Sequence, residues 1–550
     1  MTAFLIHYMA PIMFGSLVVV LLLGYPAAFS LAAVGLIYAL LGIELDLFRP
    51  DFLQALPERI YGIMNNEVLL AIPFFTFMGL ILERSGMAED LLDTVGQLFG
   101  TVRGGLAYAV VFVGALLAAT TGVVAASVIS MGLISLPIML RYGYDRRVAS
   151  GVIAASGTLA QIIPPSLVLI VMADQLGRSV GDMYEGAFVP GLALAGLYAG
   201  YIFIVTLVSP KSVPGLPAEA IIYKEPDGGR GVWSLVILVG VATLLSYLYM
   251  RRTNVEAGAD FVVLTMSLVI AICFATAVAS KLLRLRLLSV LAEQVIFVMV
   301  PPLALIFLVL GTIFIGVATP TEGGAMGATG ALALALIKKR LTWNLTRQAV
   351  QSTAKLASFV LFILIGSRIF SLTFYGVNGH VWVEDLLTSL PGGQIGFLLF
   401  VNTFVFFLAF FLDFFEIAFI VIPLLGPAAE KLGIDLIWFG VILGVNMQTS
   451  FMHPPFGFAL FYLRSVAAKD SFLDRVTGKL TPGVTTGQIY WGAVPFVAIQ
   501  ALMVVAVILV PSMVTHYKRG LSTVDPSKVQ INIAPPDLPP LDFNQPPKIQ

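Results

Sequence analysis

The stretch SGTLAQIIPPS, residues 156–166, interrupts one apolar segment, and NMQTSFMHPPF, residues 446–456, interrupts a second one in the same way. Both stretches place hydroxyl and amide side chains before two consecutive prolines. Proline removes a backbone donor and clashes with the preceding turn, which costs about 3 kcal/mol or more inside a helix. At membrane depth, freed backbone groups are tolerated only where protein or a water-filled cavity satisfies them. The two stretches therefore predict two broken helices that line a polar site.

The composition is that of a polytopic membrane protein. Of the 550 residues, 59% are hydrophobic and 11% are charged, whereas an average soluble domain has about 25% charged residues. Lys plus Arg and Asp plus Glu number 31 each, and this balance in so hydrophobic a chain argues against nucleic acid as a partner. The single cysteine, Cys273, excludes a disulfide framework. The sequence has no Gly-rich phosphate loop with Lys, no H-E-x-x-H and no G-x-S-x-G, so we expect no enzyme.

Apolar stretches of about 20 residues predict helices that cross the hydrocarbon layer. The predicted spans lie near 9–23, 26–42, 66–83, 186–208, 289–316, 321–338, 352–373 and 488–511, with an inserted pair near 233–250 and 261–280. Segments 104–141 and 394–430 each have room for two short helices and predict re-entrant hairpins. Segments 147–176 and 436–464 are overlong spans that contain the two proline motifs.

An internal repeat is indicated by one offset that holds over many positions. Pro454 and Pro455 lie 290 positions after Pro164 and Pro165. The same offset pairs Pro137 with Pro427, Gly143 with Gly433, Asp145 with Asp435 and Gly86 with Gly376, and an offset of 294 pairs Pro26 with Pro320. The chain is therefore interpreted as two homologous halves, about 1–208 and 289–511.

Charge orients these halves, because short loops rich in Lys and Arg remain in the cytoplasm. Arg141, Arg146 and Arg147 follow the first hairpin and mark the cytoplasmic face. The second hairpin then opens to the opposite face, so we expect inverted repeats with both chain ends in the periplasm. Arg251 and Arg252 fall on the outer side if the inserted pair is real, which opposes this assignment.

Oxygen-bearing residues surround each break, and hard cations such as Na⁺ take oxygen ligands. The candidate Na⁺ ligands are Thr120, Thr121, Gly122, Ser156, Gly157, Thr158, Asp413, Asn446, Gln448, Thr449 and Ser450. A carboxylate inside the membrane, such as Asp413, is a functional hypothesis by default. A structural explanation stays open for each, because hydroxyl side chains also bond to their own helices and Asp413 could be solvated.

The candidate substrate-binding residues are Gln161, Pro165, Ser166, Arg368 and His453. Arg368 could hold a carboxylate bidentately in a water-filled cavity, or its long side chain could reach to the nearby interface. His453 could donate a hydrogen bond to a substrate or cap the half-helix.

The chain resembles the large membrane subunit of tripartite ATP-independent periplasmic (TRAP) transporters, over nearly all of 1–208 and 289–511. The matching stretches are LLAIPFFTFMGLILERSG (69–86), SGTLAQIIPPS (156–166), GVATPTEGGAMGA (316–328) and LGIDLIWFGVILGVNMQTSFMHPPFGFALF (432–461). The resemblance implies the fold of the ion transporter superfamily, in which a scaffold holds a transport domain that moves as an elevator. The two hairpins and the two broken helices would form that transport domain.

The same resemblance implies Na⁺-coupled import of a small organic acid anion across the bacterial inner membrane. The partners would be a small four-helix membrane subunit and a periplasmic binding protein that delivers the substrate. The first hairpin tip, TTGVVAAS (120–127), departs from the family's Ser-richer Gly-Ser-Ser pattern, which shifts the expected ligands to Thr120, Thr121 and backbone carbonyls. The inserted pair and the tail resemble a longer subgroup labelled for mannitol or chloroaromatic compounds, with keto-acid and hydroxy-acid transporters close by.

Two alternatives remain open. One is an autonomous dicarboxylate carrier of the same superfamily that needs no binding protein, and the other is a membrane scaffold whose polar breaks only pack helices. The predicted division of the chain is 1–103 first-repeat scaffold, 104–176 first-repeat transport segment, 177–288 connecting helix with the inserted pair, 289–393 second-repeat scaffold, 394–464 second-repeat transport segment, 465–511 last helix and 512–550 flexible Pro-rich tail.

Overall fold

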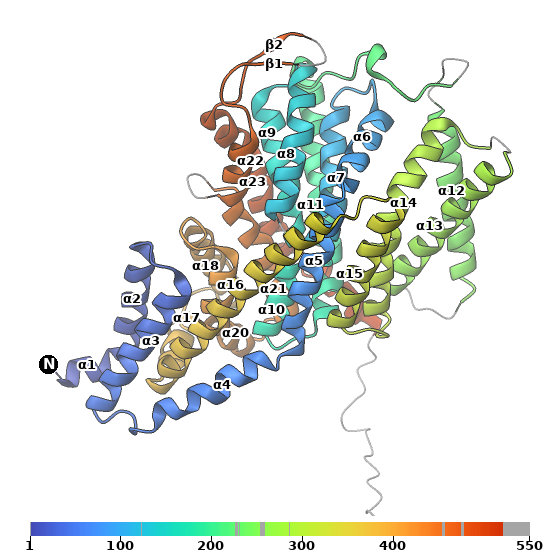
Figure 1. Cartoon of the computed structure of the whole chain (residues 1–550). Coiled ribbons are helices and arrows are strands. Elements are labelled where there is room, and N and C mark those ends of the chain that lie inside the picture. The colour runs from blue at the N-terminus through green and yellow to red at the C-terminus, as the bar shows by residue number, and fades with distance from the viewer. Residues whose placement is uncertain are drawn as a thin grey trace, which may run out of the picture. The chain divides into compact units, whose positions relative to one another are not determined.

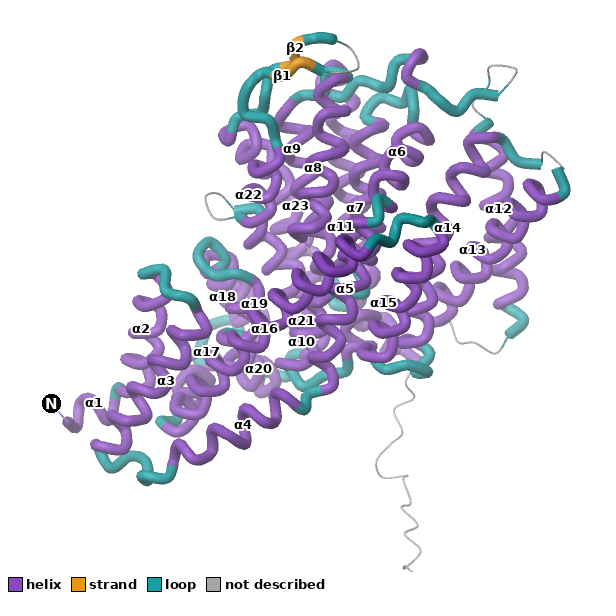
Figure 2. The backbone as a smooth tube through the Cα atoms, viewed as in Figure 1, coloured by secondary structure: helices purple, strands orange, loops and turns teal. Residues whose placement is uncertain are grey.

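The computed structural model describes residues 2–122, 124–225, 229, 231–253, 259–284, 287–453, 457–474 and 478–520. The second proline pair, Pro454 and Pro455, and the tail from residue 521 lie outside these described residues. The described chain is helical apart from one short antiparallel pair, β1 (Phe472–Leu473) and β2 (Leu480–Thr481), as Figure 2 shows. The prediction of an all-α polytopic protein is confirmed.

Eight described helices are long and apolar enough to cross a membrane, or up to ten if each of two bent helix pairs counts as one span. These eight are α3 (Ala27–Glu44), α8 (Val124–Arg141), α11 (Val180–Val208), α12 (Val232–Met250), α13 (Ala259–Leu282), α14 (Val290–Phe314), α16 (Trp343–Gly376) and α23 (Thr486–Leu509). The bent pairs join 52–64 to 68–84 at 52° and 379–388 to 393–408 at 117°.

The remaining helices are shorter. They are α1 (Thr2–His7), α2 (Met9–Leu22), α4 (Ala55–Met64), α5 (Ala71–Arg84), α6 (Met87–Phe99), α7 (Gly105–Thr121), α9 (Arg146–Thr158), α10 (Leu167–Gln175), α15 (Pro320–Ile337), α17 (Gly379–Thr388), α18 (Gly393–Leu408), α19 (Phe414–Ile420), α20 (Ile422–Lys431), α21 (Leu436–Met447), α22 (Phe458–Val466) and α24 (Ser512–Thr515). Short 3₁₀ segments are η1 (Phe52–Gln54), η2 (Glu67–Leu70), η3 (Leu159–Gln161), η4 (Pro210–Ser212), η5 (Ala218–Ala220), η6 (Gln448–Phe451) and η7 (His516–Gly520).

Both predicted hairpins have their two ends close together. At the first, the backbone N–H of Leu106 in α7 donates to Tyr144 Oη, just after α8, at 3.2 Å. At the second, Gln394 Nε2 in α18 donates to the carbonyl oxygen of Leu432, just after α20, at 2.8 Å. In Figure 1 the base of the first hairpin lies at the end of the molecule that carries β1 and β2, and the base of the second lies toward the opposite end.

The 290-residue offset carries over into local structure. Asp145 and Asp435 each cap the helix that follows, α9 and α21. Gly143 and Gly433 each adopt a left-handed conformation just before that cap, with φ of 84° and 71°. A residue with a side chain is strained in that region, which explains the choice of glycine. The two halves therefore begin their broken helices in the same way, while their relation as inverted repeats stays a prediction.

Helices α3 and α16 cross at a contact built from glycines. A Cβ at Gly366 would lie 2.3 Å from the carbonyl oxygen of Ala28, and one at Gly35 would lie 2.9 Å from that of Ile369. Thr373 Oγ1 donates to the Gly35 carbonyl at 2.9 Å across the same contact. Small residues let helix backbones approach closely in a membrane, where apolar burial drives association only weakly. The contact positions α16 beside the hairpin helices.

The connection between the two halves is fastened to the first hairpin. The carbonyl oxygens of Val213 and Ser212 accept from the backbone N–H groups of Gly104 and Asp145, both at 2.8 Å. These residues stand at the two ends of the hairpin, before α7 and after α8. Further along, Glu225 Oε1 accepts from the backbone N–H of Val290 at the start of α14, at 2.8 Å. Segment 209–231 is therefore a bonded strap rather than a loose linker.

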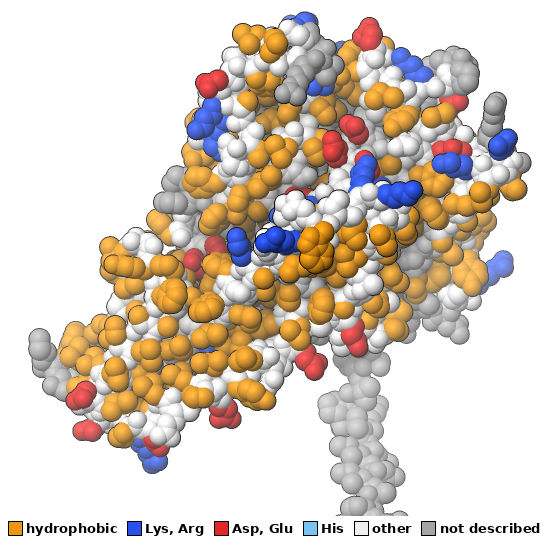
Figure 3. All heavy atoms as spheres, viewed as in Figure 1, with side chains coloured by type: hydrophobic (Ala, Val, Ile, Leu, Met, Phe, Trp, Pro, Cys, Tyr) orange, Lys and Arg blue, Asp and Glu red, His pale blue; other side chains and the backbone are white. Residues whose placement is uncertain are grey.

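The predicted inserted pair is present as α12 and α13, which pack on each other and on α14. Large apolar side chains of α12 such as Trp233 and Leu244 are exposed, at 76% and 59%. Hydrophobic side chains cover much of the visible face in Figure 3, as expected of a surface in contact with lipid. Arg251 and Arg252 follow the last residue of α12, so the objection they raise to the charge-based orientation stands.

The predicted start of the flexible tail at residue 512 is wrong. Residues 512–520 form α24 and η7, and Val514 is fully buried. A Cβ at Gly186 in α11 would lie 2.9 Å from Val514 Cγ1, so the helix packs directly on α11. This apolar contact orders a segment whose composition alone indicates a tail.

The glycine contact between α3 and α16 predicts opposite outcomes for two glycine-to-alanine changes. Gly366→Ala forces the helices apart and is expected to destabilise the protein by about 1–3 kcal/mol. Gly196→Ala, in α11 where an added Cβ would meet no atom within 4 Å, is expected to be neutral or to stabilise by up to about 1 kcal/mol. Thermal unfolding of the two detergent-purified variants checks this. Equal melting temperatures would contradict the close contact.

Candidate transport site

The two breaks meet in the interior of the protein. Gln448 Nε2, in η6, donates to the carbonyl oxygen of Thr158, the last residue of α9, at 2.6 Å. Both residues are fully buried. The two positions are themselves 290 apart, so corresponding residues of the two halves touch each other. The fractured helices thus lie together, as the sequence predicts.

The first break is closed by hydroxyl groups of its own segment. Thr158 Oγ1 donates to the carbonyl oxygen of Ala155 at 2.8 Å, and the chain then tightens into η3. Ser166 caps α10 by accepting from the Val168 N–H at 3.2 Å, and it donates to the Gln161 carbonyl at 2.5 Å. An N-cap serine satisfies a helix start in this way. The half-helix that follows the prolines therefore begins with a satisfied end.

The second break has the same kind of bonding before its prolines. Thr449 Oγ1 donates to the Asn446 carbonyl at 2.7 Å, and Ser450 Oγ donates to the Met447 carbonyl at 2.6 Å. The structural explanation left open for these hydroxyls thus accounts for their hydrogens. A hydroxyl that donates its hydrogen keeps its lone pairs, so each of these oxygens can still bind a cation.

A buried polar network extends from the crossing to α23 and α11. Gln500 Nε2 donates to Thr158 Oγ1 at 3.3 Å and to Tyr198 Oη at 2.9 Å. Both Gln500 and Tyr198 are fully buried, and sequence reasoning missed them. The available signal was a lone glutamine within the apolar span 488–511.

Several oxygens at or beside this crossing have no hydrogen-bond partner among the described residues. They are Ser156 Oγ, Gln161 Oε1, Gln448 Oε1 and Gln500 Oε1. A buried acceptor without a partner costs about 1–3 kcal/mol. A cation or an ordered water would remove that penalty, so the crossing is chemically suited to bind one.

The tip of the second hairpin presents two carboxylates. Asp413 Oδ1 accepts from the Glu416 N–H at 2.8 Å, while Glu416 Oε2 accepts from the Asp413 N–H at 2.9 Å. This reciprocal capping box fixes the start of α19. At the first hairpin tip, Gly122 ends α7 with a left-handed φ of 58°. The side chains of Thr120 and Thr121 lie outside the described part of the structure.

One cavity brings both hairpin tips and both breaks to a common space of about 480 Å³. Its lining includes Gly122 of the first tip, Gln161 and Leu167 beside the first break, Asp413 and Glu416 of the second tip, and Phe451 and Phe458 on either side of the second break. The predicted site residues that face this cavity are Gly122, Gln161 and Asp413. The others of the set lie buried behind it.

A second cavity of about 590 Å³ adjoins the first and shares Phe359 and Glu416 with it. It lies between the start of α3 and the middle of α16, and Lys355 lines it. Lys355 is the only Lys or Arg among the described residues that line these two cavities. Sequence reasoning missed it, although a lysine within the long span QSTAKLASFVLF (351–362) was a visible signal.

The family described as "Tripartite ATP-independent periplasmic transporter, DctM component" matches residues 14–513. The chain belongs to this family. Among similar proteins, the C4-dicarboxylate TRAP transporter large permease protein DctM of Pseudomonas aeruginosa is 26% identical over 468 residues, 85% of this chain and 90% of that protein. The sialic acid TRAP transporter permease protein SiaT of Haemophilus influenzae is 21% identical and covers 90% of this chain with 66% of its own length.

Among solved structures, the YdaH transporter of Alcanivorax borkumensis is 13% identical, with a TM-score of 0.46 over 85% of this chain and 90% of that chain. Membership of the DctM family makes the chain a transporter permease and not an enzyme, as the sequence predicts. The permease is a multi-pass membrane protein.

Arg368 and His453 stand apart from the cavities of this DctM-family permease. Arg368 is exposed on α16 and lines neither of them. His453 is buried between the rings of Phe406 and Phe410, with centroid distances of 4.4 and 4.2 Å. Neither ring nitrogen of His453 has a partner among the described residues, so the structure does not show it capping the half-helix.

The other predicted residues pack the permease around the break. Gly157 approaches α8 so closely that a Cβ would lie 2.3 Å from Val128 Cγ2. Asn446 Nδ2 donates to the backbone carbonyl of Asn402 in the second hairpin at 2.7 Å. Pro165 is buried within the break itself. These contacts fasten each broken helix to the hairpin of its own half.

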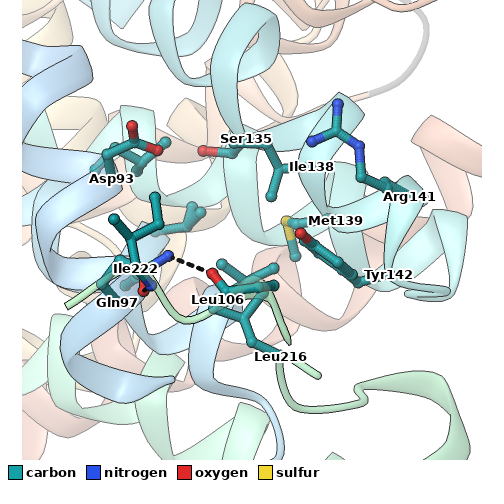
Figure 4. Close-up of a pocket in the computed structure, with 15 residues that line it drawn as sticks. Asp93, Gln97, Leu106, Ser135, Ile138, Met139, Arg141, Tyr142, Leu216 and Ile222 are labelled. Atoms are coloured by element: carbon teal, nitrogen blue, oxygen red, sulfur yellow. Dashed lines mark hydrogen bonds between the residues drawn. The ribbon is translucent and has the colours of Figure 1, made fainter. Parts of the chain in front are cut away.

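A further cavity of about 150 Å³ lies between α6, α7 and α8 and contains none of the predicted site residues. Figure 4 shows Ser135 directed toward Asp93, while the Arg141 side chain points away from both. Arg141 Nε instead bonds Asp474 Oδ2 at 2.6 Å. Gln97 closes the lower edge by accepting from the Ile222 N–H at 3.0 Å. Burial, helped by the nearby Asp90 carboxylate, raises the pKa of Asp93.

The bond between the two breaks predicts a specific loss of stability. Gln448→Leu keeps the volume of the side chain but leaves the buried Thr158 carbonyl without its donor, which is expected to cost about 1–3 kcal/mol. Gln348→Leu is the control, because Gln348 is an exposed glutamine on α16 whose side chain bonds Arg84 Nη1 and Asn344 Oδ1 at the surface. The control is expected to change stability by less than about 0.5 kcal/mol. Thermal unfolding measures both. An unchanged melting temperature for Gln448→Leu would show that the crossing does not hold the fold.

Proposed function

We propose that this permease is the membrane component of a Na⁺-coupled importer of small organic acid anions. The observation that carries the proposal is the meeting of the two broken helices, with unpartnered buried oxygens around the Gln448–Thr158 bond. Broken helices at mid-membrane offer carbonyl oxygens and half-helix ends to ions and substrates. A purely structural kink has no need of unpartnered acceptors beside it.

The proposed Na⁺ ligands form one group for each half. The first group is Thr120, Thr121, Gly122, Ser156, Gly157 and Thr158, and the second is Asp413, Asn446, Gln448, Thr449 and Ser450. Na⁺ is a hard cation and prefers such oxygen donors. The second group includes a carboxylate and the first does not, so the two sites would differ in affinity.

Coupling follows from differential binding. Na⁺ bound at the hairpin tips would satisfy the unpartnered oxygens and order the loops that face the cavity containing Gln161 and Asp413. A ligand shifts a conformational equilibrium only by its difference in affinity for the two states. We propose that the Na⁺-loaded form binds the anion and that the hairpins and broken helices then slide against α3 and α16 as an elevator.

The substrate class is drawn from the relatives and the cavity. The names of similar permeases specify C4-dicarboxylates, sialic acid and 2,3-diketo-L-gulonate, all of which are organic acids. We propose a dicarboxylate, keto acid or hydroxy acid, with binding through Gln161, Pro165, Ser166, Arg368 and His453. The proposed partners are a periplasmic binding protein and a small four-helix membrane subunit, in a bacterial inner membrane with both chain ends in the periplasm.

Asp413→Asn separates the cation-binding role of this residue from its capping role. Asparagine caps a helix as well as aspartate does, so α19 is expected to remain folded. Loss of the charge is expected to raise the Na⁺ concentration for half-maximal uptake by about tenfold or more. The measurement is uptake of a radiolabelled acid, chosen by a ligand screen of the partner binding protein, in proteoliposomes.

Asp145→Asn is the matched control, because Asp145 caps α9 through the N–H groups of Arg147 and Val148 and lines neither cavity. Its Na⁺ dependence is expected to match the parent protein. Normal Na⁺ dependence in Asp413→Asn would instead support the helix-packing scaffold.

Reconstitution distinguishes the tripartite system from an autonomous carrier. Proteoliposomes with the permease, the small subunit and the loaded binding protein are expected to accumulate the acid when Na⁺ is outside. Omission of the binding protein is expected to reduce uptake to the level of empty liposomes. Full uptake by the permease alone would establish the autonomous carrier.

A further inference from the structure

Lys355 occupies an unusual place for a lysine in a membrane helix. It lies 12 residues after Trp343 and 21 residues before Gly376, the two ends of α16. At a rise of 1.5 Å per residue these separations are about 18 Å and about 32 Å along the helix. A lysine near a helix end can extend to the interface, but Lys355 is deep within the helix. An ionisable residue at such depth faces a cavity or a partner and has a function by default.

The lysine faces open space rather than a counter-ion. Its side chain is exposed, and the structure shows no hydrogen bond or ion pair from it to a described residue. It lines the cavity that also contains Glu416, and that cavity shares Phe359 and Glu416 with the one containing Asp413 and Gln161. The two cavities therefore form neighbouring parts of one cleft between α16 and the second hairpin.

The charges in this cleft are unequal. Its described lining contains two carboxylates, Asp413 and Glu416, and a single ammonium group, Lys355. An organic anion is repelled by the carboxylates, so it needs a positive group to enter. Cations bound at Asp413 would relieve part of the repulsion, and Lys355 would supply the fixed attraction. Arg368 cannot do this, because it lines neither cavity.

We infer that Lys355 on α16 is the residue that recognises the acidic group of the substrate. This inference deepens the proposed function and rests on it. Gln161 Oε1 is an unpartnered buried acceptor on the other side of the cleft and would bind a donor such as a substrate hydroxyl. The substrate would thus be held between α16 and the broken helix. Movement of the hairpins past α16 would separate these groups, which favours release.

A direct test measures the electrostatic potential of the cleft without a substrate. In a Cys273→Ala background, Ser358→Cys places a reporter three residues from Lys355 in the same cavity. The reporter is treated with an anionic methanethiosulfonate, the ethylsulfonate, and separately with a cationic one, the ethyltrimethylammonium. The ratio of the anionic to the cationic reaction rate is expected to fall severalfold when Lys355→Gln is added, and to be retained with Lys355→Arg.

The control reporter is Ser389→Cys, an exposed position after α17 and outside both cavities. Its rate ratio is expected to be unaffected by Lys355→Gln. If the ratio at Ser358→Cys is equally unaffected, Lys355 does not set the charge of the cleft and the inference is wrong.

Transport then separates this inference from the function on which it rests. With the acid found for the binding protein, Lys355→Gln is expected to raise the substrate concentration for half-maximal uptake about tenfold or more. Lys355→Arg is expected to remain near the parent value, and the Na⁺ dependence to be unchanged in both. Parent protein without Na⁺-driven uptake would overturn the proposed function. Parent uptake that Lys355→Gln matches at every substrate concentration would overturn only the role of Lys355.

Discussion

The fold depends on one constraint, that every backbone group released inside the membrane must find a partner. Each half of the chain breaks a helix with prolines, and the released groups are satisfied by nearby hydroxyls and by the opposite half. The bond from Gln448 to the Thr158 carbonyl is the clearest case, because it joins equivalent positions of the two halves. Each break therefore helps to satisfy the other. A single half could not bury its fractured helix alone, which explains why the two are in contact.

The crossing is not fully satisfied, and this incompleteness is what makes it useful. Ser156, Gln161 and Gln448 keep acceptor oxygens without partners among the described residues, in a region from which lipid and bulk water are excluded. Fully paired polar groups make a rigid core, whereas unpaired ones favour whatever ligand can pair with them. The capping box of Asp413 and Glu416 places two carboxylates at the rim of the same space. Stability and ligand binding thus act on the same few atoms.

The sequence predicts the broken helices and hairpins well, because a proline pair and a constant offset of 290 residues are strong signals. It predicts single polar residues in apolar helices poorly, since Gln500, Tyr198 and Lys355 have no periodic pattern around them. It assigns Ser166 to substrate binding, while the structure shows its hydroxyl bonded to the backbone on both sides of the break. The short amphipathic helices α4, α6 and α17 were also missed, because they are too short and too polar to register as spans. Tertiary packing decides all of these.

The strap 209–231 bears on how the two halves of this chain came to be one polypeptide. A segment that merely joined them could be cut or lengthened freely, yet Ser212 and Val213 bond the two ends of the first hairpin and Glu225 bonds the start of α14. The joint therefore acts as a splint that sets the spacing between α7, α9 and α14. Separately synthesised halves would have to assemble without this template. The covalent link thus contributes geometry as well as connection.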